Sequence, residues 1–217
     1  MSTPSLLSLN SPTDITTTCN THPLTPTELT TLQTRSSAAK LTAYCPYSRF
    51  RVGATILTKN GEYIDGANVE NAAYPVGTCA ERVAFGKAVT GGSREVGFKA
   101  LGLSTDGSGD VPASPCGMCR QFIREFCDLD MPIFMFDNDG KFVVAKLEEL
   151  LPMSFGPEAL PPRESLGIGG TVLLASGVWY MWSYIEEGLK YILGEKRKEE
   201  SFKITNMKGE KEAVKWE

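Results

Sequence analysis

Three cysteines in two short motifs constrain this chain more than any other feature of its sequence. The first motif is Thr78-Cys79-Ala80-Glu81-Arg82, and the second is Pro115-Cys116-Gly117-Met118-Cys119-Arg120. Each motif is predicted to begin a helix, so Cys116 and Cys119 fall one turn apart on the same helix face. If the three thiols hold one metal ion, the fold has to bring two helix N-termini together, where the helix dipoles favour thiolates.

Zinc is the ion that this ligand set predicts, with one ion per subunit. Three protein ligands leave one tetrahedral position for water, which is the pattern of a catalytic zinc site rather than a structural one. Glu81 lies two residues after Cys79, where a carboxylate can sit beside the metal and transfer protons without binding it. Three thiolates would give the zinc unit a net charge of −1, and Arg82 is the candidate cation to offset it.

Other interpretations of these residues stay open at this stage. A structural zinc ribbon needs a fourth Cys or His, but Cys19, Cys45 and Cys127 form no second Cys-x-x-Cys pair. We interpret Cys45 and Cys127 as buried thiols. The single histidine, His22, lies in a region rich in Ser, Thr and Pro and is interpreted as a solvated residue. Glu81 could instead complete a capping box begun by Thr78, and Arg82 could be a solvated surface charge.

The pattern of apolar and turn residues predicts an α/β fold. Its expected core is a mixed five-stranded sheet sandwiched by helices, with elements in the order α-β-β-α-β-α-β-β-α. A capping box at Thr25 begins the first helix, and Asn60-Gly61 predicts a tight turn between the first two strands. The expected ranges are 26–43, 52–58, 63–68, 78–90, 98–104, 114–127, 132–136, 142–145 and 147–151.

Three regions are expected along the chain. Residues 1–24 are predicted to be a disordered arm, 25–162 a zinc domain, and 163–217 an extension of unknown role. Within the extension, Leu166–Ile185 has no charged residue, and Glu186–Glu217 is rich in Lys and Glu. The uncharged stretch is long enough to span a bilayer but contains many Gly and polar residues, so a membrane anchor is disfavoured. A partner-binding helix and a poorly ordered appendage are the alternatives.

The charge balance argues for a small substrate. The net charge is −4, and the first 160 residues contain no run of Lys and Arg of the kind that binding to a nucleic-acid polymer requires. No Lys or Arg precedes Arg35, so the start of the chain resembles neither a secretion signal nor a mitochondrial presequence. We therefore expect a cytoplasmic protein with reduced thiols.

The two cysteine motifs together resemble the signature of the cytidine deaminase superfamily, in its three-cysteine form. Three further segments resemble the small homotetrameric cytidine deaminases. They are the pocket entrance Tyr44–Ala54, the ribose-binding segment Asn68–Pro75 and the closing segment Leu150–Pro157. The resemblance extends from about residue 27 to residue 162.

The resemblance implies a function and roles for individual residues. It implies hydrolytic deamination of cytidine and deoxycytidine within pyrimidine salvage, with Glu81 protonating first N3 of the ring and then the departing amine. Phe50 would contact the pyrimidine, Asn68 and Glu70 the ribose hydroxyls, and Phe155 the pocket of a neighbouring subunit in a homotetramer. Alternative roles are a core position for Phe50, a core or subunit-interface position for Phe155, and a strand end for Asn68. Alternative functions are deamination of another aminopyrimidine nucleoside such as blasticidin S, of a polynucleotide, or a structural zinc module.

Overall fold

The computed structural model describes residues 5–107, 112–161, 203–205 and 211–213. The chain divides into two compact units, Met1–Ala159 and Leu160–Glu217, and each is described by itself. In the second unit, β7 (Lys203–Thr205) and β8 (Lys211–Ala213) form an antiparallel pair. The stretch Leu166–Ile185 lies outside the described residues, so its role stays a prediction. None of the helices within the described ranges is both long and apolar enough to cross a membrane.

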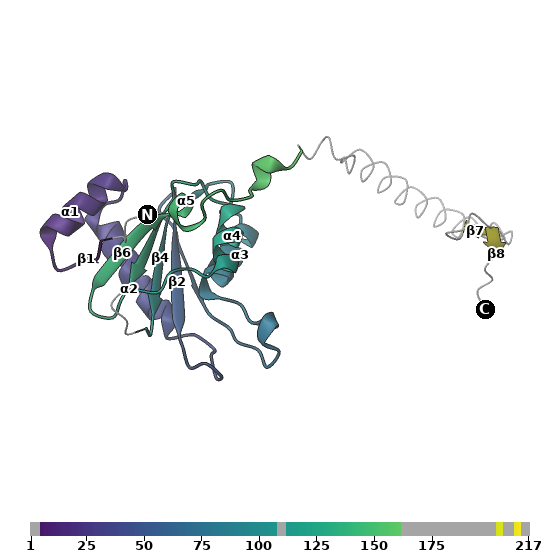
Figure 1. Ribbon diagram of the computed structural model, residues 1–217, viewed down its shortest axis with the longest axis horizontal. Helices are drawn as coiled ribbons and strands as arrows, with labels where there is room; N and C mark the ends of the chain where they lie inside the picture. Colours follow the sequence, from purple (N-terminus) through teal and green to yellow (C-terminus); the bar gives the residue numbers. More distant parts are fainter. Residues whose placement is uncertain (1–4, 108–111, 162–202, 206–210, 214–217) are drawn as a thin grey trace, which may run out of the picture. The chain divides into compact units, whose positions relative to one another are not determined.

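A six-stranded mixed sheet forms the centre of the first unit, in the order β1-β6-β5-β4-β2-β3 (Figure 1). β4 and β5 run parallel and are connected through α4, whereas the other neighbouring strands pair antiparallel. The prediction of a mixed α/β sheet is confirmed, and β1 adds one strand to the five expected. The strands are β1 (Leu7–Ser8), β2 (Val52–Thr58), β3 (Tyr63–Ala67), β4 (Phe98–Thr105), β5 (Pro132–Phe136) and β6 (Lys141–Lys146).

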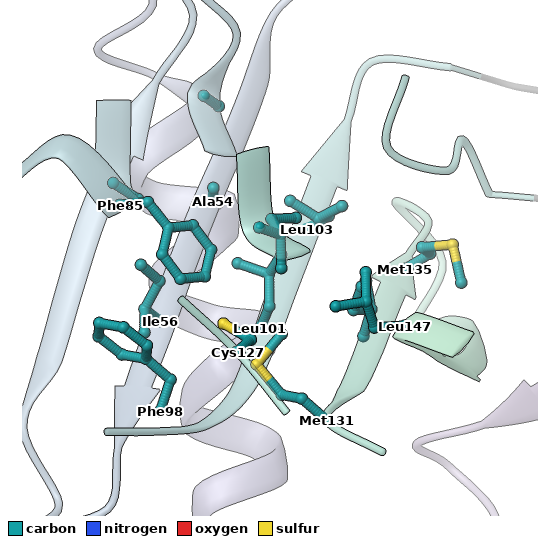
Figure 2. Close-up of a cluster of buried hydrophobic side chains, with 14 of the residues drawn as sticks. Ala54, Ile56, Phe85, Phe98, Leu101, Leu103, Cys127, Met131, Met135 and Leu147 are labelled. Atoms are coloured by element: carbon teal, nitrogen blue, oxygen red, sulfur yellow. The ribbon is translucent and has the colours of Figure 1, made fainter. Parts of the chain in front are cut away.

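Helices cover both faces of this sheet. Figure 1 shows α1 and α2 on one face and α3 and α4 on the other. Each face buries its own apolar cluster, and Figure 2 shows the one that includes Phe85 of α3 and Leu101 of β4. The helices are α1 (Pro12–Thr21), α2 (Pro26–Lys40), α3 (Ala80–Thr90), α4 (Gly117–Arg124) and α5 (Leu147–Leu150), with short 3-10 turns at Tyr74–Val76 and Pro157–Ala159.

Local signals in the sequence account for several of these boundaries. The capping box of α2 is present, because the Thr25 hydroxyl accepts from the Glu28 amide at 3.1 Å and the Glu28 carboxylate accepts from the Thr25 amide at 2.7 Å. Gly61 has φ +88°, the left-handed conformation that the turn between β2 and β3 requires. The helix expected over 114–127 is shorter, because Cys116 in extended conformation is its N-cap residue.

The prediction that residues 1–24 form a disordered arm is wrong for residues 5–24. Leu7 pairs with Phe142, so β1 covers the outer edge of β6. Ser11 caps α1 by accepting from the Asp14 amide, and Ile15 of that helix contacts the buried cluster around Phe142. The helix contains few apolar residues, so its stability comes from its contacts with the rest of this unit rather than from its own periodicity.

The interpretation of His22 as a solvated residue is also wrong. Its ring is half-buried and meets the ring of Phe134 edge-on, with centroids 5.9 Å apart. Burial lowers the pKa of this imidazole, and the nearby Lys146 lowers it further. His22 therefore belongs to the packing of the N-terminal segment on the sheet.

Gly66 fixes how closely α3 approaches the sheet. A Cβ atom at this position would lie 2.5 Å from the Ala84 amide nitrogen and 2.6 Å from the Ala80 carbonyl oxygen, and neither backbone atom can move without moving the helix. We expect Gly66→Ala to lower the free energy of unfolding by about 3 kcal/mol or more. Gly86→Ala is the control, because Gly86 lies in α3 itself and a Cβ atom there would meet no other atom within 4 Å. This variant should raise the free energy of unfolding by about 1 kcal/mol, since alanine favours a helix more than glycine does. Denaturant unfolding of both variants checks this, and equal effects would contradict it.

Candidate active site

The three cysteines of the two motifs lie at the N-termini of α3 and α4. Cys79 is the N-cap residue of α3 and Cys116 that of α4, both with extended backbone and neither with a side-chain capping hydrogen bond. Cys119 lies in the first turn of α4 and is fully buried. The fold thus brings together thiols that are separated by about 40 residues of sequence, as the motifs predicted.

The distances between the sulfur atoms suit a tetrahedral zinc ion. Cys79 Sγ lies 3.9 Å from Cys116 Sγ, which lies 3.5 Å from Cys119 Sγ. All three sulfur atoms lie within 4.8 Å of one another. Zinc–sulfur bonds of about 2.3 Å at tetrahedral angles place two sulfur atoms about 3.8 Å apart. The thiols therefore fit the ion, and the set leaves a fourth position for another ligand.

The surroundings of Cys79 favour its thiolate. A hydrogen bond from Cys119 lowers the pKa of Cys79 to about 5, and the Arg82 guanidinium lowers it as well. The same hydrogen bond and burial raise the pKa of Cys119. Arg82 donates to the Gly77 carbonyl at 3.2 Å, and its buried Nε has no partner among the described atoms. The guanidinium is thus held beside the sulfur cluster, where it can offset negative charge.

Glu81 lies at the second position of α3, only 4% exposed. Burial raises the pKa of its carboxyl, and the charge of Cys79 adds to this effect. The alternative of a capping box with Thr78 is wrong, because the N-cap residue is Cys79. A carboxyl with a raised pKa holds its proton at a higher pH than an exposed one does, which suits general acid and base catalysis.

The segment predicted to bind ribose lies next to the first cysteine motif. Val69 forms one β-bridge with Tyr44 and another with Thr78, the residue before Cys79. Asn68 donates to the Phe50 carbonyl at 2.9 Å and accepts from the Val52 amide at 2.8 Å. The Glu70 carboxylate accepts from the amides of two residues in the pocket-entrance segment. Both side chains therefore shape this segment, and each retains further hydrogen-bonding capacity.

A hollow of about 310 Å³ adjoins the same segments. This volume suits a small polar molecule such as a nucleoside. Its lining residues combine aromatic rings with polar groups, and they are Tyr47, Ser48, Glu70, Asn71, Tyr74 and Gly77.

Phe50 and Phe155 are exposed, so the interpretation of either residue as core is wrong. Phe50 precedes β2, and Phe155 lies in the segment that follows α5. The Phe155 carbonyl accepts from Gln121 of α4 at 2.9 Å. The segment carrying Phe155 is therefore attached to the helix that carries two of the cysteines.

Two arginines with no role predicted from the sequence strengthen this attachment. Arg120 donates to the carbonyls of Pro115 and Leu150, each at 2.7 Å. Arg124 is buried, donates to the Ser154 hydroxyl at 3.0 Å and pairs with Glu158. The position of Arg120 directly after Cys119 was the one signal in the sequence that could have indicated its role.

The fold and the site together define a class of protein. Three convergent thiols, with a buried carboxyl next to Cys79 that lies outside their cluster, have the chemistry of a catalytic type of zinc site. Its position at two helix N-termini, on one face of a mixed sheet, favours negatively charged groups such as thiolates.

Comparison with known proteins identifies the family. The chain belongs to the family described as "Cytidine and deoxycytidylate deaminase zinc-binding region", whose model matches residues 27–135. A cytidine deaminase from Sporosarcina psychrophila is 46% identical over 125 residues, which cover 58% of this chain and 89% of the relative. The crystal structure of a cytidine deaminase from Burkholderia pseudomallei aligns with a TM-score of 0.55 at 36% identity, covering 58% of this chain and 98% of that one. A blasticidin-S deaminase from Bacillus cereus is 32% identical over 121 residues, covering 54% of this chain and 84% of the relative.

Proposed function

We propose that this protein is a zinc-dependent enzyme that hydrolyses the exocyclic amine of cytidine and deoxycytidine, giving uridine or deoxyuridine and ammonia. The observation that carries the proposal is the convergence of Cys79, Cys116 and Cys119 beside buried Glu81. Membership of the family and the similarity to cytidine deaminases over most of their length support it.

The three thiolates would hold one zinc ion per subunit, and Arg82 would offset their excess negative charge. Bound zinc lowers the pKa of a coordinated water from 15.7 to about 7, which makes a nucleophile available at neutral pH. Glu81 would accept one proton of the attacking water and deliver it to N3 of the pyrimidine. It would then take the second proton, from the hydroxyl group added at C4, and deliver it to the departing amine, which leaves as ammonia. Its buried position fits both transfers, because a raised pKa brings the carboxyl closer to the pH at which it works.

Ultraviolet absorbance provides the direct test of the activity. Purified protein should convert cytidine to uridine, lose the activity when zinc is removed by a chelator, and recover it when zinc is added. Blasticidin S in the same assay separates the proposed function from that of the Bacillus cereus relative. Turnover of blasticidin S without turnover of cytidine would contradict the proposal.

The sugar contacts give a prediction that separates binding from structure. We propose that Asn68 and Glu70 hydrogen-bond the ribose hydroxyls and that Phe50 contacts the base. Glu70→Ala should then raise KM for cytidine about tenfold, because a charged hydrogen-bond partner is lost. Inhibition by the free base cytosine should stay unchanged, since cytosine has no ribose.

Steady-state kinetics and cytosine inhibition check this, and Asn68→Ala should show the same selectivity. Glu62→Ala, which changes an exposed carboxylate between β2 and β3, is the matched control. Equal losses toward cytidine and cytosine would show that Glu70 acts only by holding the amides of Tyr47 and Ser48.

We further propose a homotetramer that works in cytoplasmic pyrimidine salvage. The exposed side chains of Met153 and Phe155 support an assembly in which the closing segment reaches a neighbouring subunit. The absence of a basic run in the first 160 residues supports a nucleoside rather than a nucleic-acid polymer as substrate. Light scattering on the active protein would measure the assembly directly.

A further inference from the structure

A buried lysine connects three separate segments at the end of α2. Lys40 is 7% exposed, and its ammonium donates to the Thr105 carbonyl at 3.1 Å and to Asn138 Oδ1 at 2.7 Å. The same nitrogen lies 3.2 Å from Asp106 Oδ1. A buried ammonium is costly unless it is paired and hydrogen-bonded, and here all three of its donors have acceptors.

Asp106 is also paired with Arg51. Its Oδ2 accepts from Arg51 Nε at 2.7 Å and from the Arg51 amide at 3.2 Å, while its own amide donates to the Arg51 carbonyl at 3.1 Å. Asp106 thus holds both the backbone and the side chain of Arg51. Lys40, Asp106 and Arg51 form one network, which we call the 40–106–51 network.

The network ends next to Phe50. The Phe50 ring lies against the backbone that follows Asp106, since a Cβ atom at Gly107 would be 3.7 Å from the Phe50 ring atom Cζ. On its other side, Phe50 is held through its carbonyl by Asn68. The exposed ring therefore lies beside the backbone that follows Asp106, and its own residue directly precedes Arg51, so both of its neighbours belong to the 40–106–51 network.

We propose that Lys40, acting through Asp106 and Arg51, is a positioning residue that holds the Phe50 ring in place for the pyrimidine. This inference rests on the proposed function, in which Phe50 contacts the base. A ring contact of this kind is made in both the ground state and the transition state, so its loss raises KM and leaves kcat unchanged.

A double-mutant cycle on the full-length zinc-loaded protein tests the proposal. Arg51→Gln and Asp106→Asn should each raise KM for cytidine about tenfold, with kcat and zinc content unchanged. In a Phe50→Ala background the same changes should raise KM less than about twofold, because the ring that they position is already absent. Lys40→Met should also raise KM for cytidine about tenfold alone and less than about twofold in the Phe50→Ala background. Lys40→Arg keeps the charge, so its KM should stay close to that of the wild type.

Two controls distinguish a failure of this inference from a loss of folding and from a failure of the proposed function. Lys59→Met removes an exposed ion pair with Asp128 at the far end of β2 and should change neither constant. Arg51 is exposed, so its variant tests the proposal even if a Lys40 variant fails to fold. Effects that are additive with Phe50→Ala, or a fall in kcat at constant KM, would overturn the inference. A wild-type protein that leaves cytidine unchanged would instead overturn the proposed function.

Discussion

Replacing Glu81 with alanine is expected to lower kcat for cytidine at least about 100-fold while zinc stays bound. The carboxyl is buried beside the sulfur cluster and is not one of the three converging ligands. Without it, no side chain at this position accepts the proton of water or delivers one to the ring. Zinc content is measured by atomic emission and turnover by absorbance on the same preparation.

A matched control separates this chemistry from a general effect of charge. Glu125→Ala removes an exposed carboxylate just after α4 and should leave kcat unchanged. Glu81→Gln keeps the size of the side chain and should be as inactive as the alanine variant. A Glu81→Ala protein that retains more than about a tenth of the wild-type rate would show that another group transfers the protons.

Replacing Cys119 with alanine is expected to remove both the zinc and the activity. Two thiolates alone do not complete the ligand set, and the ion supplies several kcal/mol of stabilisation to the reaction, so turnover should fall at least about 1,000-fold. Cys127→Ala is the matched control, because Cys127 is also a buried thiol close to α4 but lies outside the cluster. That variant should keep its zinc and its kcat with only a loss of stability.

The role of Cys119 as a zinc ligand can be contradicted by the same measurements. If Cys119→Ala retains stoichiometric zinc and full turnover, the ion is held elsewhere and the three sulfur atoms are not its ligands. Adding zinc in excess should not rescue the variant, whereas it should rescue wild-type protein after treatment with a chelator.

The sequence predicted much of the site because the signals lie close together in the chain. Cys116 and Cys119 are one helical turn apart, and Glu81 follows Cys79 at a fixed distance, so helix geometry alone brings each pair together. The strands β2 and β5 were predicted with their observed ends, since Gly and Asn turns and short apolar runs mark them.

The parts that were missed depend on contacts between distant segments. The polar helix α1 packs through Ile15 and Cys19 against a buried cluster that includes Phe134 and Phe142, which lie more than 100 residues further along the chain. In the sequence, Lys40 is an ordinary basic residue at the C-terminus of a helix. Its partners Asp106 and Asn138 are distant in the chain and come next to it only in the folded protein. Neither pattern has a local period or motif that a reading of the sequence can detect.

The position of Cys79 and Cys116 at the N-caps of their helices affects how much of the protein is folded when zinc is scarce. Serine, threonine, asparagine or aspartate at such a position accepts a hydrogen bond from the first turn and stabilises a helix by about 1 kcal/mol, whereas these thiols make no such bond. The metal-free chain therefore gives up some stability at two helix ends, and a zinc ion bound by both thiols would replace it by joining the two ends. The abundance of the folded protein in a cell should accordingly follow the availability of zinc, in addition to the rate of its synthesis.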